Sequence, residues 1–188
     1  MDNNTLKKIA KILNENQISW ALGASSMLYF HGLVDQPRDI DLMVDESDAL
    51  RAVDLLKPHT SKLYTDDGKG KYATKYFYEM EIDGQAVDVI GGYRILRGDW
   101  VYDFPVLSSL KLKVVQVEET GIPITHLEDW YIAYMIMNDP KGRVPTIEKY
   151  VVDKGGFEMP LQLENAIHQI KSKAPFENEL LSKLQKWL

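Results

Sequence analysis

The chain contains no cysteine among its 188 residues. This absence excludes disulfide bonds and metal sites built from thiolates, and it agrees with the reducing environment of the cytoplasm. A long hydrophobic run is also missing. No stretch approaches the roughly 20 apolar residues of a membrane-spanning helix, and residues 1–5 show no apolar signal region. We therefore expect a cytoplasmic protein that has no membrane partner.

Basic residues are also fewer than acidic residues. The chain has 22 Lys and Arg against 28 Asp and Glu, which gives a net charge of −6 at pH 7. A protein that binds nucleic acid over a broad surface usually carries an excess of positive charge, so we expect no extensive nucleic-acid surface. The apolar share of 45% is ordinary for a globular protein of this length, which is long enough to bury a core. Nothing in the composition indicates an oligomeric state.

Acidic and apolar residues alternate from residue 39 to residue 44, where the chain reads Asp-Ile-Asp-Leu-Met-Val. Side chains two residues apart on a strand share one face, so Asp39 and Asp41 project together. The apolar residues of the alternation face the opposite way and are predicted core residues: Ile40, Leu42 and Val44. Two neighbouring carboxylates repel each other and lose solvation when they are buried. A divalent cation such as Mg²⁺ resolves this conflict, because it prefers oxygen ligands.

A third carboxylate lies in a later apolar run, residues 85–90, which reads Gln-Ala-Val-Asp-Val-Ile. If this run forms a strand beside strand 39–44, then Asp39, Asp41 and Asp88 make up a three-carboxylate site. Such a site can hold two metal ions roughly 3.5–4 Å apart for an in-line displacement at phosphorus. The pattern therefore predicts a two-metal centre.

A glycine turn precedes the Asp-x-Asp strand. Gly23 follows an apolar strand predicted at residues 18–22, and residues 24–30 have helical character. A strand, a tight turn and a helix in this order leave backbone N–H groups pointing outward at the helix N-terminus. That arrangement suits the terminal phosphates of a nucleotide. We expect Ser25 or Ser26 to cap the helix or to donate to a phosphate.

The order of these features resembles the polymerase-beta-like nucleotidyltransferase superfamily: a glycine turn, a helix, an Asp-x-Asp strand and a later strand with one Asp. Within it, the chain is most similar to small bacterial proteins of the abortive-infection and antibiotic-modifying types, over about residues 18–106. The resemblance implies a fold of class α/β (α+β), with a mixed β-sheet flanked by helices. It also implies transfer of a nucleoside monophosphate from a nucleoside triphosphate to an acceptor hydroxyl or phosphate, with release of pyrophosphate.

The resemblance also implies roles for individual residues. The implied metal ligands and catalytic residues are Asp39, Asp41 and Asp88, which would hold Mg²⁺ or Mn²⁺. Asp88 would in addition act as a general base toward the acceptor. The implied nucleotide-binding residues are Gly23, Ala24, Ser25, Ser26 and Arg38. The acceptor is not indicated, because acceptor pockets are built largely from variable loops.

Structural explanations of the three acids stay open. In one of them Asp39 is a turn residue and Asp41 is a solvent-facing strand residue, with Arg38 or a lysine as their partner. In another, Asp88 forms an ion pair with one of the two arginines in residues 94–97. Both explanations would satisfy the charges without a metal ion.

A second class of function is also open. The family usually has Gly or Ser at the position where this chain has Ala24. That departure favours, as an alternative, a catalytically degenerate binding or regulatory module, for example one half of a toxin–antitoxin pair, that keeps the fold without the turnover.

The periodicity of the chain predicts two regions, a nucleotidyltransferase-like domain at residues 1–121 and a helical C-terminal region at residues 122–188. Strands are expected at residues 18–22, 39–44, 74–82, 85–90, 93–102, 112–117 and 122–125, with an Asp83-Gly84 hairpin turn. Helices are expected at residues 5–16, 25–30, 46–56, 126–137, 147–152, 161–171 and 177–188. Residues 66–71 read as a polar loop. The aromatic stripe near residue 130 is predicted to be core.

Overall fold

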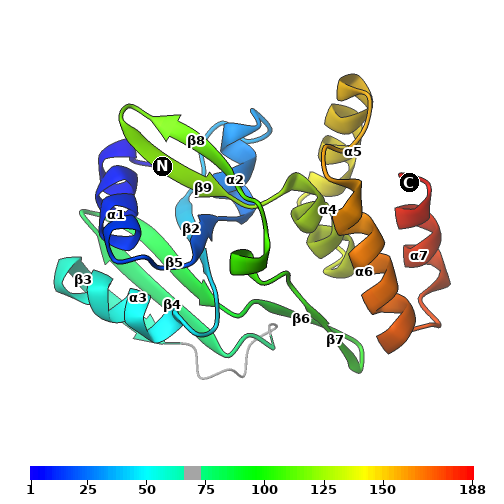
Figure 1. Cartoon of the computed structure of the whole chain (residues 1–188), viewed down its shortest axis with the longest axis horizontal. Helices are drawn as coiled ribbons and strands as arrows, with labels where there is room; N and C mark the ends of the chain where they lie inside the picture. The colour runs from blue at the N-terminus through cyan, green and yellow to red at the C-terminus, as the bar shows by residue number, and fades with distance from the viewer. Residues whose placement is uncertain (66–72) are drawn as a thin grey trace. The chain divides into compact units, whose positions relative to one another are not determined.

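The computed structural model describes residues 1–65 and 73–188 (Figure 1). The predicted polar loop at residues 66–71 lies outside the described residues. The chain divides into two compact units. The first comprises Met1–Arg94 and Pro105–Thr125, and the second comprises Ile95–Phe104 and His126–Leu188. The domain boundary between residues 121 and 122 stays a prediction.

A mixed sheet is the centre of the first unit. Its strands are β1 (Trp20–Leu22), β2 (Asp39–Val44), β3 (Thr60–Thr65), β4 (Tyr76–Ile82), β5 (Gln85–Gly91), β8 (Lys113–Val117) and β9 (Thr120–Ile124). The order of these seven strands is β3-β4-β5-β2-β1-β9-β8. The helices of this unit are α1 (Asn3–Glu15), α2 (Ala24–Phe30) and α3 (Ala49–Leu56), with short 3₁₀ helices η1 (Lys57–His59) and η2 (Leu107–Ser109). The predicted α/β (α+β) class, a mixed sheet flanked by helices, is confirmed.

The two strands that carry the predicted acids are direct neighbours. β2 and β5 run parallel, and Asp41 lies opposite Asp88. β5 follows β4 through a hairpin whose two turn residues, Asp83 and Gly84, have φ angles of 52° and 79°. Positive φ at both positions is typical of the type I′ turn, whose twist matches that of antiparallel strands. The hairpin predicted at Asp83-Gly84 is confirmed.

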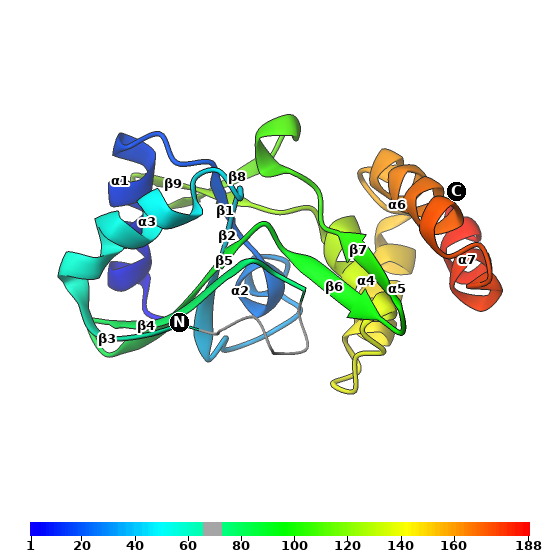
Figure 2. The same ribbon diagram turned by 90° about the horizontal axis from the view of Figure 1, so that it is seen from below.

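The alternation in β2 separates the two faces of the sheet. Ile40, Leu42 and Val44 are buried in the core on one face, and the fourth apolar residue, Met43, is buried on the face of Asp39 and Asp41. Figure 2 shows α1 and α3 on one side of the sheet and α2 on the other. We call the face from which Asp39, Asp41 and Asp88 project the carboxylate face. It lies on the side of α2, because Ser25 of that helix bonds to Asp41.

The helix predicted at residues 46–56 begins later than expected, at Ala49, and has no acid in its first turn. The prediction was wrong there because Glu46 is engaged elsewhere. Its carboxylate forms ion pairs with Lys75 at 2.9 Å and Arg94 at 3.3 Å. These tertiary ion pairs hold Glu46 outside the helix.

Residues 93–102 form a hairpin and not the single strand predicted. The two strands are β6 (Arg94–Arg97) and β7 (Trp100–Asp103), which pair as a separate two-stranded sheet. The chain reverses at Gly98, which has a φ of 59°. Glycine reaches this left-handed conformation without the steric cost that other residues meet, so it permits the tight reversal.

Helices make up most of the second unit. They are α4 (Leu127–Ile136), α5 (Arg143–Lys154), α6 (Pro160–Lys173) and α7 (Asn178–Gln185). Every residue of α4 is buried, including Trp130, Tyr131 and Tyr134, so the aromatic stripe is core as predicted. Arg97 ties β6 to the segment before α7 through a two-pronged bond to Glu177, at 2.7 and 3.0 Å. Among the described residues, none of the helices is both long and apolar enough to cross a membrane.

Candidate functional site

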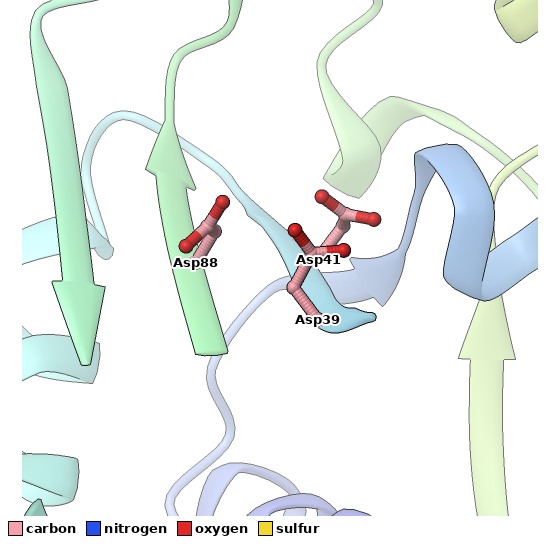
Figure 3. Close-up of side chains that lie close together, drawn as sticks. All are labelled: Asp39, Asp41 and Asp88. Carbon is pink, nitrogen blue, oxygen red and sulfur yellow. The ribbon is translucent and has the colours of Figure 1, made fainter. Parts of the chain in front are cut away.

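Three carboxylates meet on the carboxylate face of the sheet. Asp39 and Asp41 come from β2, and Asp88 comes from the neighbouring β5 (Figure 3). One oxygen from each of the three carboxylates lies within 4.8 Å of the others. In a parallel pair, residues at the same level project from the same face, so the register of Asp41 with Asp88 brings these two side chains together. The two-residue period of β2 then adds Asp39 to the group.

Burial and mutual repulsion shape the electrostatics of this group. Asp41 is only 8% exposed, which excludes the explanation that it is a solvent-facing strand residue. Burial, followed by the charges of Asp39 and Asp88, raises the pKa of Asp41 from 3.8 to about 7. Burial, followed by the charges of Asp39 and Glu79, raises the pKa of Asp88 from 3.8 to about 7. Without a cation, the protein therefore holds protons on these carboxyl groups near neutral pH.

The two arginines offered as structural partners of Asp88 have other ion-pair partners. Arg94 pairs with Glu46 and Arg97 pairs with Glu177. These ion pairs account for both guanidinium groups without Asp88. The explanation of Asp88 as one half of a salt bridge with either arginine therefore has no support in the described ion pairs.

The donor set suits a divalent metal ion. All three groups are carboxylates, they converge, and protons or a cation would relieve their repulsion. Oxygen donors of this kind are the ligands that Mg²⁺ and Mn²⁺ prefer. The residues Asp39, Asp41 and Asp88 thus fit the metal that their pattern predicts.

The glycine turn lies directly beside the carboxylates. The backbone N–H of Gly23 donates to the carbonyl of Asp41 at 3.0 Å, and Gly23 caps α2. Ala24 follows with a φ of 42°, in the left-handed region that disfavours residues with a Cβ atom. The Oγ of Ser25 then donates to Asp41 at 3.2 Å and to Asp39 at 3.5 Å. The turn therefore brings one hydroxyl group into contact with two of the three carboxylates.

The neighbouring serine has a different environment. Ser26 is fully buried, and its hydroxyl accepts from the backbone N–H of Asp41 at 3.1 Å. The same hydroxyl donates to the carbonyl of Asp39 at 3.0 Å. Ser26 therefore fastens α2 to the backbone of β2, while Ser25 contacts the carboxylates themselves.

This difference predicts unequal effects on stability. Ser26→Ala should lower the free energy of unfolding by about 1–3 kcal/mol, because it leaves the buried N–H of Asp41 and the partly buried carbonyl of Asp39 without their partner. Ser25→Ala should cost less, because the carboxyl groups beside it can bind a proton in place of the lost donor. Urea unfolding of the two variants checks the prediction. Equal losses would show that Ser26 has no special structural role.

Arg38 lies at the entrance to β2, immediately before Asp39, and its side chain is exposed. Its backbone carbonyl accepts from the Nε2 of Gln85 at 2.9 Å. This bond links the starts of β2 and β5 and so supports the register that aligns the acids. The exposed guanidinium group leaves Arg38 able to meet a phosphate from solution.

Glu79 of β4 was not among the predicted site residues, although the structure places it next to the site. It lies opposite Asp88 in the β4–β5 hairpin. The signal was present in the sequence, because a two-residue turn at Asp83-Gly84 pairs residue 82 with residue 85, and counting back from there pairs residue 79 with residue 88.

No protein-family sequence profile matches the chain, and no curated protein matches it. Solved structures do match the chain. A Thermotoga maritima protein named as a candidate nucleotidyltransferase is 25% identical, with a TM-score of 0.62, over 80% of this chain and 92% of that one. The aminoglycoside nucleotidyltransferase ANT(2″)-Ia, in complex with adenylyl-2″-tobramycin, is 9% identical, with a TM-score of 0.54, over 80% of this chain and 88% of that one. The likeness to the second structure shows the fold alone. The chain has the polymerase-beta-like nucleotidyltransferase fold.

Proposed function

We propose that this protein is a metal-dependent nucleotidyltransferase. It would move a nucleoside monophosphate from a nucleoside triphosphate to an acceptor hydroxyl or phosphate. The observation that carries the proposal is the convergence of Asp39, Asp41 and Asp88, whose oxygens lie within 4.8 Å of one another on a fold shared with nucleotidyltransferases. The glycine turn beside them supports the same conclusion, since Ser25 contacts the carboxylates directly.

The metal would be held by all three aspartates. A bound Mg²⁺ or Mn²⁺ supplies charge neutralisation and Lewis-acid stabilisation to the phosphoryl group in transfer. Asp41 is the most buried of the three, and its backbone is held on both sides, by Gly23 and by Ser26. Its carboxylate is therefore the best oriented ligand in the group.

The proposed reaction assigns a proton to Asp88. The acceptor oxygen attacks the α-phosphorus, the bond from that phosphorus to the pyrophosphate oxygen breaks, and pyrophosphate leaves with the bonding electron pair. The hydroxyl proton of the acceptor passes to an Oδ atom of Asp88. This carboxylate suits the task by its position, because Asp88 lies beside Asp41 on the neighbouring strand and is only half-buried, so an acceptor hydroxyl can reach it.

The phosphates of the nucleotide would lie along the glycine turn. We assign their orientation to Ala24 and Ser25, with Arg38 as the charged partner, while Gly23 forms the turn and bonds to the Asp41 carbonyl. Ser26 holds this turn against β2, which is a positioning role. The alternative function is that of a catalytically degenerate binding or regulatory module, and it rests on Ala24 in the glycine turn. A measurement of turnover distinguishes this module from the enzyme.

A thermal-shift screen tests the proposal. The wild type and the double variant Asp39→Ala/Asp41→Ala are heated with ATP, GTP, CTP or UTP, with and without Mg²⁺. A nucleotide present at about 100 times its dissociation constant stabilises the protein by about 2.7 kcal/mol. We expect such a rise with at least one nucleotide, only when Mg²⁺ is present, and not in the double variant.

The nucleotide that stabilises the protein is then used to measure pyrophosphate release. Metal-dependent release excludes the non-catalytic module. The absence of any shift with all four nucleotides would contradict the proposed function and would favour the module, whose partner would then be sought among proteins.

A further inference from the structure

The site lies at one end of a row of side chains that crosses the sheet. Four consecutive strands place a residue at the same level: Asp41 of β2, Asp88 of β5, Glu79 of β4 and Tyr64 of β3. Residues paired in this way project from the same face, so the row extends the carboxylate face beyond the three aspartates. Neighbouring strands lie about 4.8 Å apart, so each member of the row is one side-chain contact away from the next.

Exposure increases along the row. Asp41 is 8% exposed, Asp88 is half-buried, Glu79 is exposed, and Tyr64 is 60% exposed. The buried end is the one enclosed by α2 and Ser25, where the nucleotide phosphates are assigned. Along this row, the exposed end beside Glu79 gives a second substrate the more accessible approach to Asp88.

The carboxylate of Glu79 forms no hydrogen bond and no ion pair with the described part of the chain, residues 1–65 and 73–188. Glu81, two residues further along the same strand and on the same face, is bonded to Lys62 and Ser61, at 2.7 Å each. The two acids thus lie on the same strand and the same face, but they differ in their hydrogen-bond and ion-pair partners. Glu81 is neutralised by Lys62, whereas none of the described residues, 1–65 and 73–188, neutralises Glu79.

We propose, resting on the proposed nucleotidyl transfer, that Glu79 is a specificity-determining residue that selects acceptors with an ammonium group a few bonds from the reacting hydroxyl. With the hydroxyl at Asp88, a substituent two or three bonds away falls beside the next residue of the row. An ammonium group there forms a charge-assisted hydrogen bond with the carboxylate. Tyr64, the next in line, offers an exposed ring on which a cation or an apolar part of the acceptor packs.

A charge series of small acceptors tests the inference. Ethanolamine and glycolate carry one hydroxyl group on a two-carbon chain and ethylene glycol carries two equivalent ones, so rates are compared per hydroxyl group; the three acceptors are positive, negative and neutral, respectively, at about pH 8. Transfer of the nucleoside monophosphate to each is measured with Mg²⁺ and the nucleotide found in the thermal-shift screen. We expect the wild type to prefer ethanolamine over ethylene glycol by roughly 10-fold in kcat/KM, mostly through a lower KM, as one hydrogen bond to a charged group provides.

Variants at two positions separate specificity from a structural effect. Glu79→Gln should bring the ratio of ethanolamine to ethylene glycol close to one, and Glu79→Lys should shift the preference to glycolate. The ratio is the right readout, because the charge of Glu79 also acts on Asp88 and so affects all acceptors together. The matched control is Glu81→Gln, which removes an acid already paired with Lys62 and should keep the wild-type preference.

The outcomes distinguish this inference from the proposed function. Pyrophosphate release with equal use of the three acceptors, or an unchanged preference in Glu79→Gln, would overturn the role of Glu79 and leave the nucleotidyltransferase intact. Absence of pyrophosphate release with every nucleotide would overturn both.

Discussion

Replacement of Asp41 by asparagine is expected to abolish transfer and at the same time to stabilise the metal-free protein. Loss of groups that only support a metal ligand costs 10–100-fold, so loss of the most buried ligand should lower pyrophosphate release by more than about 100-fold. The stability gain has the opposite sign because the substitution removes a buried charge that repels two other carboxylates. We expect the free energy of unfolding to increase by roughly 2 kcal/mol at about pH 8. This increase corresponds to a rise in Tm of about 4–8 °C for a chain of this size.

The measurement pairs an assay of pyrophosphate release with thermal unfolding in the presence of a chelator. Asp54→Asn is the matched control, because Asp54 is an exposed acid on α3, the helix on the opposite side of the sheet from the site. It should leave both transfer and Tm near their wild-type values. An Asp41→Asn variant that unfolds would show that the residue is structural, and one that retains transfer would remove Asp41 from the catalytic group.

The stability of the metal-free protein is expected to fall as the pH rises from about 4 to about 7. The pKa values of Asp41 and Asp88 are 3.8 in the unfolded chain and about 7 in the folded protein. Between these values the folded state binds more protons than the unfolded state, so each step up in pH favours unfolding. The stabilising contribution is complete below about pH 4 and is lost above about pH 7.

Chemical unfolding across this range, for the wild type and Asp41→Asn, isolates the contribution. Burial lowers the pKa of His126, which acts in the opposite direction, but this group is common to both proteins and cancels in the comparison. The wild type should lose roughly 2 kcal/mol relative to the variant on the way from acid to neutral pH.

Mg²⁺ should reverse this loss, because a metal binds only the deprotonated carboxylates. The rise in Tm on addition of Mg²⁺ should therefore be large at about pH 8 and small at about pH 5, and Asp41→Asn should show little of it at either. A difference between the two proteins that does not change with pH would contradict the assigned pKa values. A Mg²⁺ effect that is as large in acid would contradict a carboxylate site.

Local chemistry determined several features of this protein without any knowledge of the fold. The alternation of acids and apolar residues in 39–44 was enough to place Asp39 and Asp41 on one face and the core residues on the other. The Asp83-Gly84 dipeptide was enough to predict the hairpin, and counting from this turn would also have given the pairing of Glu79 with Asp88, which was not predicted. These features depend on side-chain period and turn conformation, which are set by a few neighbouring residues.

Only the tertiary structure decided which strands pair, which side chains are buried and where α3 begins. The parallel pairing of β2 with β5 joins segments more than 40 residues apart, and nothing local specifies which strands become neighbours or that Asp41 meets Asp88. Burial separates Ser25, which bonds to carboxylates, from Ser26, which bonds to the backbone, although the two are adjacent in the chain. The late start of α3 has the same origin, since Glu46 is held by partners 29 and 48 residues away. Spacing along the chain predicts which residues share a face, while burial and long-range pairing, which depend on the whole packed unit, decide which of them meet.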